Sequence, residues 1–268
     1  MKKLFAVIGF VCAFAQSDLF AGSLAKPEKL QELLIGPVQK VRIELGTLKQ
    51  VDSQWIPKGP KIPWLETHYD KNGYRVEEEQ FYTEKSLDFK SVFHYDSEGN
   101  LSEGVEYDYQ GAVTFNWTYL HDRDRKVIEK KQFFPNGDLF SITTFVYDET
   151  GNLLEEKRFL EQTKNQFRWT YDYNKSGRKL EESYYLMRPG RQAGEVKTML
   201  NFRAVFGYDD RGNLVEETKY DASGKLSSKR RFQYEYDPIG NWITQTAFGS
   251  AGPTVAEITY RTITYFPQ

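Results

Sequence analysis

The stretch Thr143–Phe159, TTFVYDETGNLLEEKRF, decides the fold. Tyr147-Asp148 lies at its centre, and Gly151 follows three residues after the aspartate. An Asp side chain can accept hydrogen bonds from the backbone just ahead of it, and Gly readily adopts a positive φ, so this spacing predicts a tight turn. The β-branched and aromatic residues on both sides of the turn predict two antiparallel strands.

The same pattern recurs along the chain, mostly at intervals of 26 residues. Its first residue, counted as position zero of each unit, is Tyr69, Tyr95, His121, Tyr147, Tyr173, Tyr208 and Tyr236. Position +4 is Gly in six of these seven units and Arg125 in the other, and position +12 is aromatic in all seven. A second turn follows, with Gly at position +16 in Gly111, Gly137, Gly224 and Gly252. Each unit is therefore expected to contain turn, strand, turn and strand.

Neither connection is long enough for a crossover, so neighbouring strands must pair antiparallel. We expect an all-β protein, a meander of about 15 strands of about 6–9 residues each that forms one curved or spiral sheet over residues 55–268. A half unit with Trp55 and Gly59 before a strand near residues 62–69 opens this domain, and an insertion near Met187–Glu195 enlarges one hairpin loop. Two alternatives stay open, a sheet closed into a barrel and a lipid-embedded barrel. The latter needs an apolar outer face, whereas one face of these strands carries many charges.

The first 21 residues have the composition of a secretory signal peptide. Lys2 and Lys3 precede an apolar run, and cleavage is expected after Ala15 or Ala21. Residues 22–54 form a lead-in with a possible short helix at residues 27–35 and a first strand. Cys12 is the only cysteine and lies inside the leader, so the mature chain has no disulfide. The expected location is periplasmic or extracellular.

Side chains alternate between the two faces of a strand, so even and odd positions of each unit should face opposite ways. The even face holds the zero-position Tyr and the aromatic residues at −2 and +12, and it is expected to be the more buried face. Position +8 is Glu in six units: Glu77, Glu103, Glu129, Glu155, Glu181 and Glu216. Even numbering predicts that these carboxylates lie among the aromatic rings, opposite the −2 residues.

The predicted ligand-binding surface lies on this even face, where position −4 alternates between large and small residues. Trp117 and Trp169 are two units apart with Thr143 between them, and four strand steps put them roughly 19 Å apart. The predicted surface comprises Trp117, Tyr119, Trp169, Tyr171, Glu129 and Glu155. It suits an extended ligand, such as an oligosaccharide or a peptide. The alternative is that the two Trp rings fill space in a closed core.

Several functional classes find no support in the sequence. The net charge of −2, with both signs interspersed, gives no basic stripe for nucleic acid. The three histidines, His68, His94 and His121, are not spaced as metal ligands, and no dinucleotide, phosphate-loop or protease motif occurs. No cofactor and no metal are expected. Paired carboxylates leave open an enzyme that acts on polysaccharide, although a Glu that repeats in six units is more typical of a structural element.

The repeats resemble the bacterial RHS or YD-repeat family. The segment Arg231–Asn241, RFQYEYDPIGN, is similar to the family signature, and YDETGNL from Tyr147 and YDDRGNL from Tyr208 match it too. The resemblance covers roughly residues 55–265 and implies curved or spiralling antiparallel sheets, which in long members wrap into a shell around a toxin. It also implies carbohydrate or cell-surface binding. This chain has about seven and a half units and no large toxin domain, so it looks like a short, toxin-free member.

These observations predict a secreted, non-enzymatic binding or scaffold protein. Its expected partner is a glycan or a protein of the cell envelope, and the mature chain is not expected to be embedded in the membrane. A polysaccharide-acting enzyme and an immunity-like protein that sequesters a toxin are the alternatives.

Overall fold

The computed structural model describes residues 32–267, except residues 53, 84–85, 190–195 and 250–255. The predicted signal peptide and residues 22–31 lie outside the described residues. Glu32–Ile35 form a turn and irregular backbone, so the described part of the expected helix at residues 27–35 is not helical. Among the described residues, no helix is long and apolar enough to cross a membrane.

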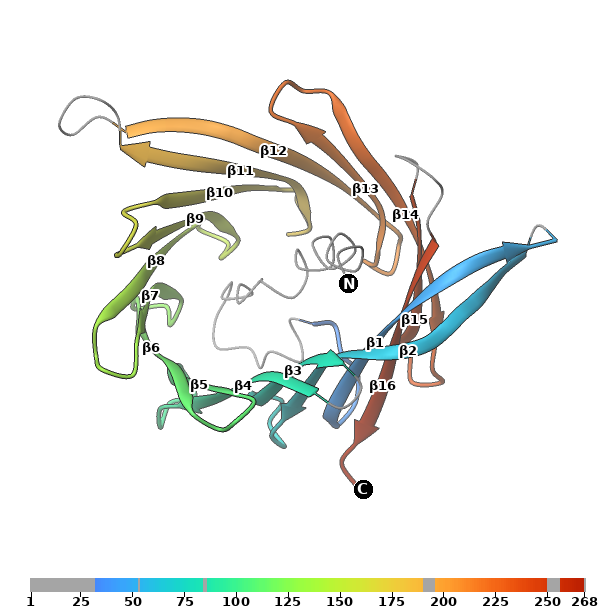
Figure 1. Ribbon diagram of the computed structural model, residues 1–268, viewed down its shortest axis with the longest axis horizontal. Coiled ribbons are helices and arrows are strands. Elements are labelled where there is room, and N and C mark those ends of the chain that lie inside the picture. Colours follow the sequence, from blue (N-terminus) through green and yellow to red (C-terminus); the bar gives the residue numbers. More distant parts are fainter. Residues whose placement is uncertain (1–31, 53, 84–85, 190–195, 250–255, 268) are drawn as a thin grey trace.

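Sixteen antiparallel strands form one closed barrel, and each strand pairs with its neighbours in chain order (Figure 1). The strands are β1 Val38–Val51, β2 Gln54–Tyr69, β3 Arg75–Thr83, β4 Ser86–Tyr95, β5 Leu101–Asp108, β6 Val113–His121, β7 Val127–Phe133, β8 Leu139–Tyr147, β9 Leu153–Leu160, β10 Gln166–Tyr173, β11 Lys179–Pro189, β12 Val196–Tyr208, β13 Leu214–Asp221, β14 Leu226–Tyr236, β15 Trp242–Gly249 and β16 Ala256–Tyr265. The prediction of an open curved or spiral sheet was wrong, because β16 pairs with β1 from Val38↔Tyr265 to Thr47↔Glu257. This pairing removes both sheet edges.

The Tyr-Asp turns have the chemistry that the sequence predicts. In the central unit, Oδ1 of Asp148 accepts hydrogen bonds from the backbone N–H groups of Thr150 and Asn152, both at 2.9 Å. Gly151 has a φ of 93°. The tyrosine has a further role, because Tyr147 Oη donates to the carbonyl oxygen of Val127 in the preceding unit at 2.9 Å. The repeated dipeptide thus forms the turn and also ties one hairpin to the next.

Arg125 occupies a turn position that Gly fills in the other units, and its φ is 64°. A side chain with a Cβ is strained in this left-handed region, at a cost of about 1–2 kcal/mol relative to Gly. The Arg125 side chain pairs with Glu98 at 3.0 Å in an exposed position, which contributes little stability. We expect Arg125→Gly to be more stable than Arg125→Ala by about 1 kcal/mol, because both lack the ion pair and only the alanine keeps the strain. Urea denaturation of the two variants measures the difference; equal stabilities would contradict the assignment of strain to this backbone.

A β-bulge follows every Tyr-Asp turn and changes which residues face inward. In the central unit Tyr147 pairs with Leu153, but Val146 pairs with Glu155, so Leu154 is an extra residue in the strand. The same shift occurs in all seven units. A one-residue shift moves every following side chain to the other face. The prediction that the +8 glutamates lie among the aromatic rings was therefore wrong, because they face the outside of the barrel.

Two details of the strands also differ from expectation. Gly59 was expected in a turn but lies within the 16-residue strand β2, where its φ of 80° accompanies an irregular register opposite β1. The strands are 7 to 16 residues long rather than 6 to 9. The insertion after Met187 extends β11 and β12, which stay paired out to Pro189↔Val196.

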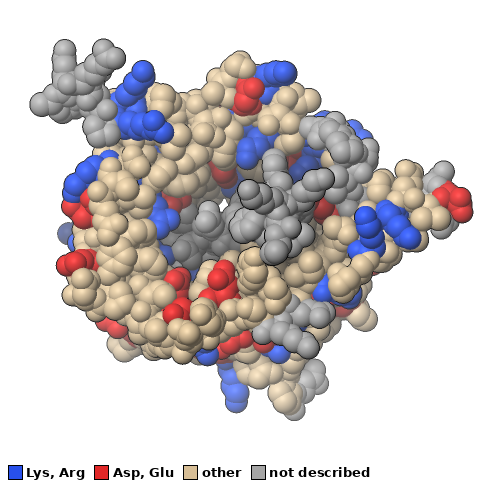
Figure 2. All heavy atoms as spheres, viewed as in Figure 1, with Lys and Arg blue, Asp and Glu red and all other residues tan. Residues whose placement is uncertain are grey.

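The two faces of the barrel have different chemistry. The outer face carries ion pairs between neighbouring strands, such as Lys90 with Glu77 at 2.6 Å, and charges of both signs lie around the surface (Figure 2). The inner face holds the apolar core, including a cluster of Val127, Phe145 and Leu153 with Tyr119, Tyr147 and Tyr171 packed against it. The predicted burial of the zero and −2 aromatic residues is thus correct for this part of the barrel.

Candidate functional site

The structure divides the six predicted site residues between the two faces. The register places Trp117, Tyr119, Trp169 and Tyr171 on the inner face. Glu129 and Glu155 lie on the outer face, where Glu129 pairs with Lys131 and Glu155 pairs with Lys157 and Arg168. The two carboxylates therefore cannot act together with the four rings, and the physical reason is the bulge between positions +6 and +8.

Trp117 belongs to the core. Its side chain is 7% exposed and stacks on Phe93 with ring centroids 6.4 Å apart and an interplanar angle of 7°. Gly104 lies opposite it, and a Cβ there would come within 2.6 Å of the indole ring. Thr143, at 6% exposure, is also buried. The inner face is thus packed at Trp117, as the alternative of a closed core expects for this ring, and the groove stays a prediction.

Trp169 lies in a different environment, a set of four partly exposed rings on β10, β11 and β12. We call Phe167, Trp169, Tyr184 and Phe202 the aromatic wall. Trp169 stacks on Tyr184 with centroids 4.9 Å apart, and Tyr184 contacts Phe202 at 5.4 Å. Phe167 lies almost parallel to Tyr184 at 6.3 Å. Each ring keeps part of its surface exposed, and Lys219 Nζ lies over the Phe202 ring at 3.6 Å.

A row of carboxylates lies beside the aromatic wall on the same inner face. Glu156, Glu182 and Glu217 occupy position +9 on β9, β11 and β13, and the bulge turns this position inward. Sequence reasoning missed them, since odd numbering placed them on the opposite face. The sequence does show an acidic residue at +9 after the repeated turn. It shows no local pattern that predicts the bulge, so the inward direction of these side chains could not be predicted.

Two of these carboxylates have partners. Tyr171 Oη donates to Glu156 Oε2 at 3.3 Å, and burial together with Glu156 and Glu182 raises the pKa of Tyr171 above its usual value. Lys179 Nζ donates to Glu182 Oε2 at 2.7 Å and lies over the rings of Tyr171 and Phe206. Tyr171 and Lys179 therefore hold the carboxylates of Glu156 and Glu182 in place beside the aromatic wall.

Glu217 is different. It is 9% exposed, and within the described part of the chain it has no hydrogen bond and no ion pair. Arg230 lies directly opposite it in the register, but the Arg230 guanidinium binds Glu257 at 2.7 Å instead. Burial raises the pKa of the Glu217 carboxyl, while Arg230 and Lys219 oppose that shift.

Charged groups of both signs lie on this inner region. Its carboxylates include Glu156, Glu182, Glu217 and Glu257, and its cations include Arg158, Lys179, Lys219, Arg230 and Arg261. Among the residues that the structure describes, no group of three or more His, Cys, Asp and Glu could hold a metal ion.

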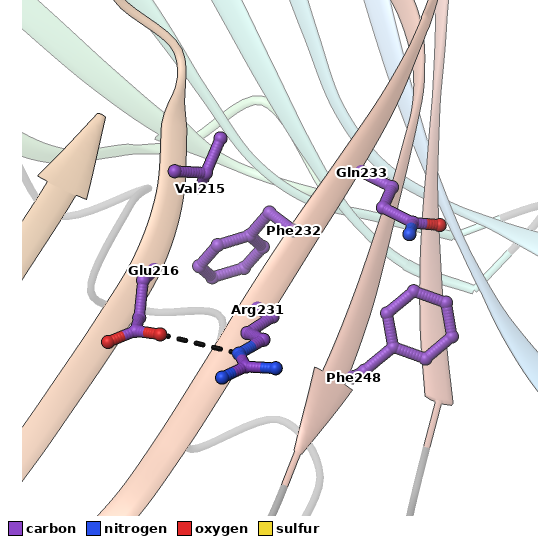
Figure 3. A pocket seen from close by; sticks show the side chains of 6 residues that line it. All are labelled: Val215, Glu216, Arg231, Phe232, Gln233 and Phe248. Atoms are coloured by element: carbon purple, nitrogen blue, oxygen red, sulfur yellow. Dashed lines mark hydrogen bonds and ion pairs between the residues drawn. The ribbon is translucent and has the colours of Figure 1, made fainter. Parts of the chain in front are cut away.

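A pocket on β13, β14 and β15 is a weaker candidate (Figure 3). It is lined by Val215, Glu216, Arg231, Phe232, Gln233 and Phe248. Its charged groups are already paired, because Glu216 binds Arg231 at 3.3 Å and Lys229 at 2.6 Å. The Arg231 side chain is exposed, so water competes for any contact that it makes.

Comparisons with known proteins bear on the fold. No family model matches the chain, and no curated protein matches it. A porin-like protein from Bacteroides uniformis ATCC 8492 has a similar structure, with 11% identity and a TM-score of 0.54 over 85% of this chain and 97% of that chain. A structure of TcdB2-TccC3-Cdc42 is 10% identical, with a TM-score of 0.18 over 80% of this chain and 16% of that chain. The first likeness supports the closed barrel. Membership of the RHS or YD-repeat family stays a prediction.

Proposed function

We propose that this chain is a non-enzymatic binding protein of the cell envelope that holds a neutral oligosaccharide against the inner face of β9–β13. The observation that carries the proposal is the aromatic wall, which lies beside a row of carboxylates on the same face. The location outside the cytoplasm rests on the predicted signal peptide.

Sugar chemistry matches both halves of this surface. The C–H face of a pyranose packs on an aromatic ring, whose surface is large and apolar. Hydroxyl groups donate to carboxylates, and such charge-assisted hydrogen bonds are stronger than neutral ones. Charges of both signs lie on this face and several are paired with each other, as Lys179 is with Glu182 and Arg230 with Glu257, which favours a neutral ligand over a phosphate or an amine.

The dimensions of the surface favour an extended ligand. The aromatic wall runs from β10 to β12, and two strand steps correspond to roughly 10 Å. The carboxylates run from β9 to β13, which is four steps and roughly 19 Å. A chain of several sugar rings spans this distance, whereas a monosaccharide contacts only part of it.

The charged residues of the outer face favour a barrel that is surrounded by water rather than lipid. A lipid-embedded barrel needs an apolar outer band about 25 Å tall. Here the outward residues at the middle of the strands include Glu155, which pairs with Lys157 and Arg168. We therefore propose that the mature chain purifies without detergent.

The test compares two adjacent tyrosines of β11 that point to opposite faces. Tyr184 belongs to the aromatic wall, and Tyr185 faces outward under Arg168. We expect Tyr184→Ala to weaken binding of cellohexaose, maltohexaose or N-acetylchitohexaose at least tenfold, about 1.4 kcal/mol, because a stacking surface is lost. Tyr185→Ala should leave binding unchanged. Isothermal titration calorimetry measures both. Equal effects of the two changes, or no binding by the wild type, would contradict the proposal, and release of shorter sugars would indicate an enzyme.

A further inference from the structure

We infer that Glu217 is the polar anchor of this surface, a carboxylate that makes no hydrogen bond or ion pair with the described residues and so can accept hydrogen bonds from ligand hydroxyl groups. The inference rests on the proposed function and deepens it, because it assigns a specific residue to ligand recognition.

The contrast with the neighbouring carboxylates carries the argument. Glu156 and Glu182 are each bound by a side chain of the adjacent strand or of their own strand. Among the residues that the structure describes, no side chain forms a hydrogen bond or ion pair with Glu217, although a cation, Arg230, lies directly opposite it in the register. Arg230 forms its ion pair with Glu257 on β16 instead. Glu217 therefore keeps free acceptor positions, although the charge of Arg230 still acts on it.

Such a carboxylate is unfavourable unless something binds it. A buried charge without a hydrogen bond lowers the stability of the folded state. Glu217 keeps 9% of its surface exposed, and a ligand hydroxyl would reach the carboxylate through this part. The unpaired carboxylate lowers the stability of the free barrel. Binding is favoured because the ligand supplies the missing hydrogen bonds.

The charged groups around Glu217 come from three strands: Arg230 on β14, Lys219 on β13 itself, and Glu182 with Lys179 on β11. A fourth strand, β12, contributes the uncharged ring of Phe206. The cations offset part of the cost of burial but do not remove it, since the pKa of Glu217 stays raised. A raised pKa means that Glu217 favours folding most when it is protonated. This contribution is complete below the pKa of an unfolded Glu and is lost as the pH rises through the higher folded value.

The experiment measures stability and binding in the same variants of the full chain. Glu217→Leu and Glu217→Gln should raise the melting temperature at pH 7.5 by about 2–4 °C, and less at pH 4.5, because an unpaired charge is removed. Glu217→Leu should weaken binding of the best hexasaccharide at least tenfold. The matched control is Glu216→Gln on the outer face, which should leave binding unchanged.

The outcomes separate this inference from the proposed function. If Tyr184→Ala loses binding and Glu217→Leu does not, the aromatic wall binds the sugar and the anchor is wrong. A lower melting temperature in both Glu217 variants would also overturn the inference, because the carboxylate would then stabilise the barrel itself. If the wild type binds none of the three hexasaccharides, both proposals fail.

Discussion

Phe145→Ala is expected to lower the free energy of unfolding by about 3–5 kcal/mol, the largest effect of any single change that we predict. The ring is 6% exposed and packs with Val127 and Leu153 on the inner face, with three tyrosines around this cluster. Removing it takes away apolar burial and leaves a cavity that the rigid strands cannot close. The melting temperature should fall by about 10 °C, as measured by circular dichroism.

The control for this change is the next residue. Val146 lies on the outer face and is 50% exposed, so Val146→Ala should cost less than about 1 kcal/mol. The two positions share one strand and differ only in the face to which they point. Similar losses at both would show that the inner face is not the packed one.

Asn241→Ala is expected to destabilise the barrel by about 2–4 kcal/mol through the seam where the barrel closes. The side chain is 2% exposed and accepts a hydrogen bond from the backbone N–H of Ile35 at 2.7 Å. Its Nδ2 donates to the carbonyl oxygen of Ile35 at 2.9 Å and to Tyr265 Oη at 2.8 Å. Alanine would leave the backbone groups of Ile35 without these partners, and the segment that leads into β1 would lose its attachment to the β14–β15 turn.

Asn152 provides a matched control, because it occupies the same position in the central unit. Its Nδ2 donates to Asp148 and Thr150, both within its own turn. We expect Asn152→Ala to cost less than about 1 kcal/mol, since water can replace these partners at an accessible turn. Hydrogen exchange should show faster opening of β1 and β16 in Asn241→Ala alone. Uniform opening of all strands would mean that the seam is not a separate unit of stability.

The surface that we propose for the ligand was predictable in part. The aromatic residues at −4 and −2 were placed on the correct face, because no bulge lies between position −4 and the Tyr-Asp turn. The carboxylates were assigned to the wrong face, because the bulge lies on the strand that leaves the turn. Glu129 and Glu155 are thus structural ion-pair residues, whereas Glu217 has the chemistry expected of a binding residue.

The sequence by itself determined the hairpins, their order and their turn chemistry. These features depend on contacts between residues two to four apart, such as Asp148 with Thr150 and Asn152, so a 26-residue repeat encodes them fully. Only the tertiary structure decided that the sheet closes into a barrel and which side chains point to its inner face. Closure joins Ile35 to Asn241 across 206 residues, and no property of a single repeat specifies how many units complete the ring. Facing depends on the bulge at Leu154, which exists only once two strands pair, because one extra backbone residue reverses the alternation of every side chain after it.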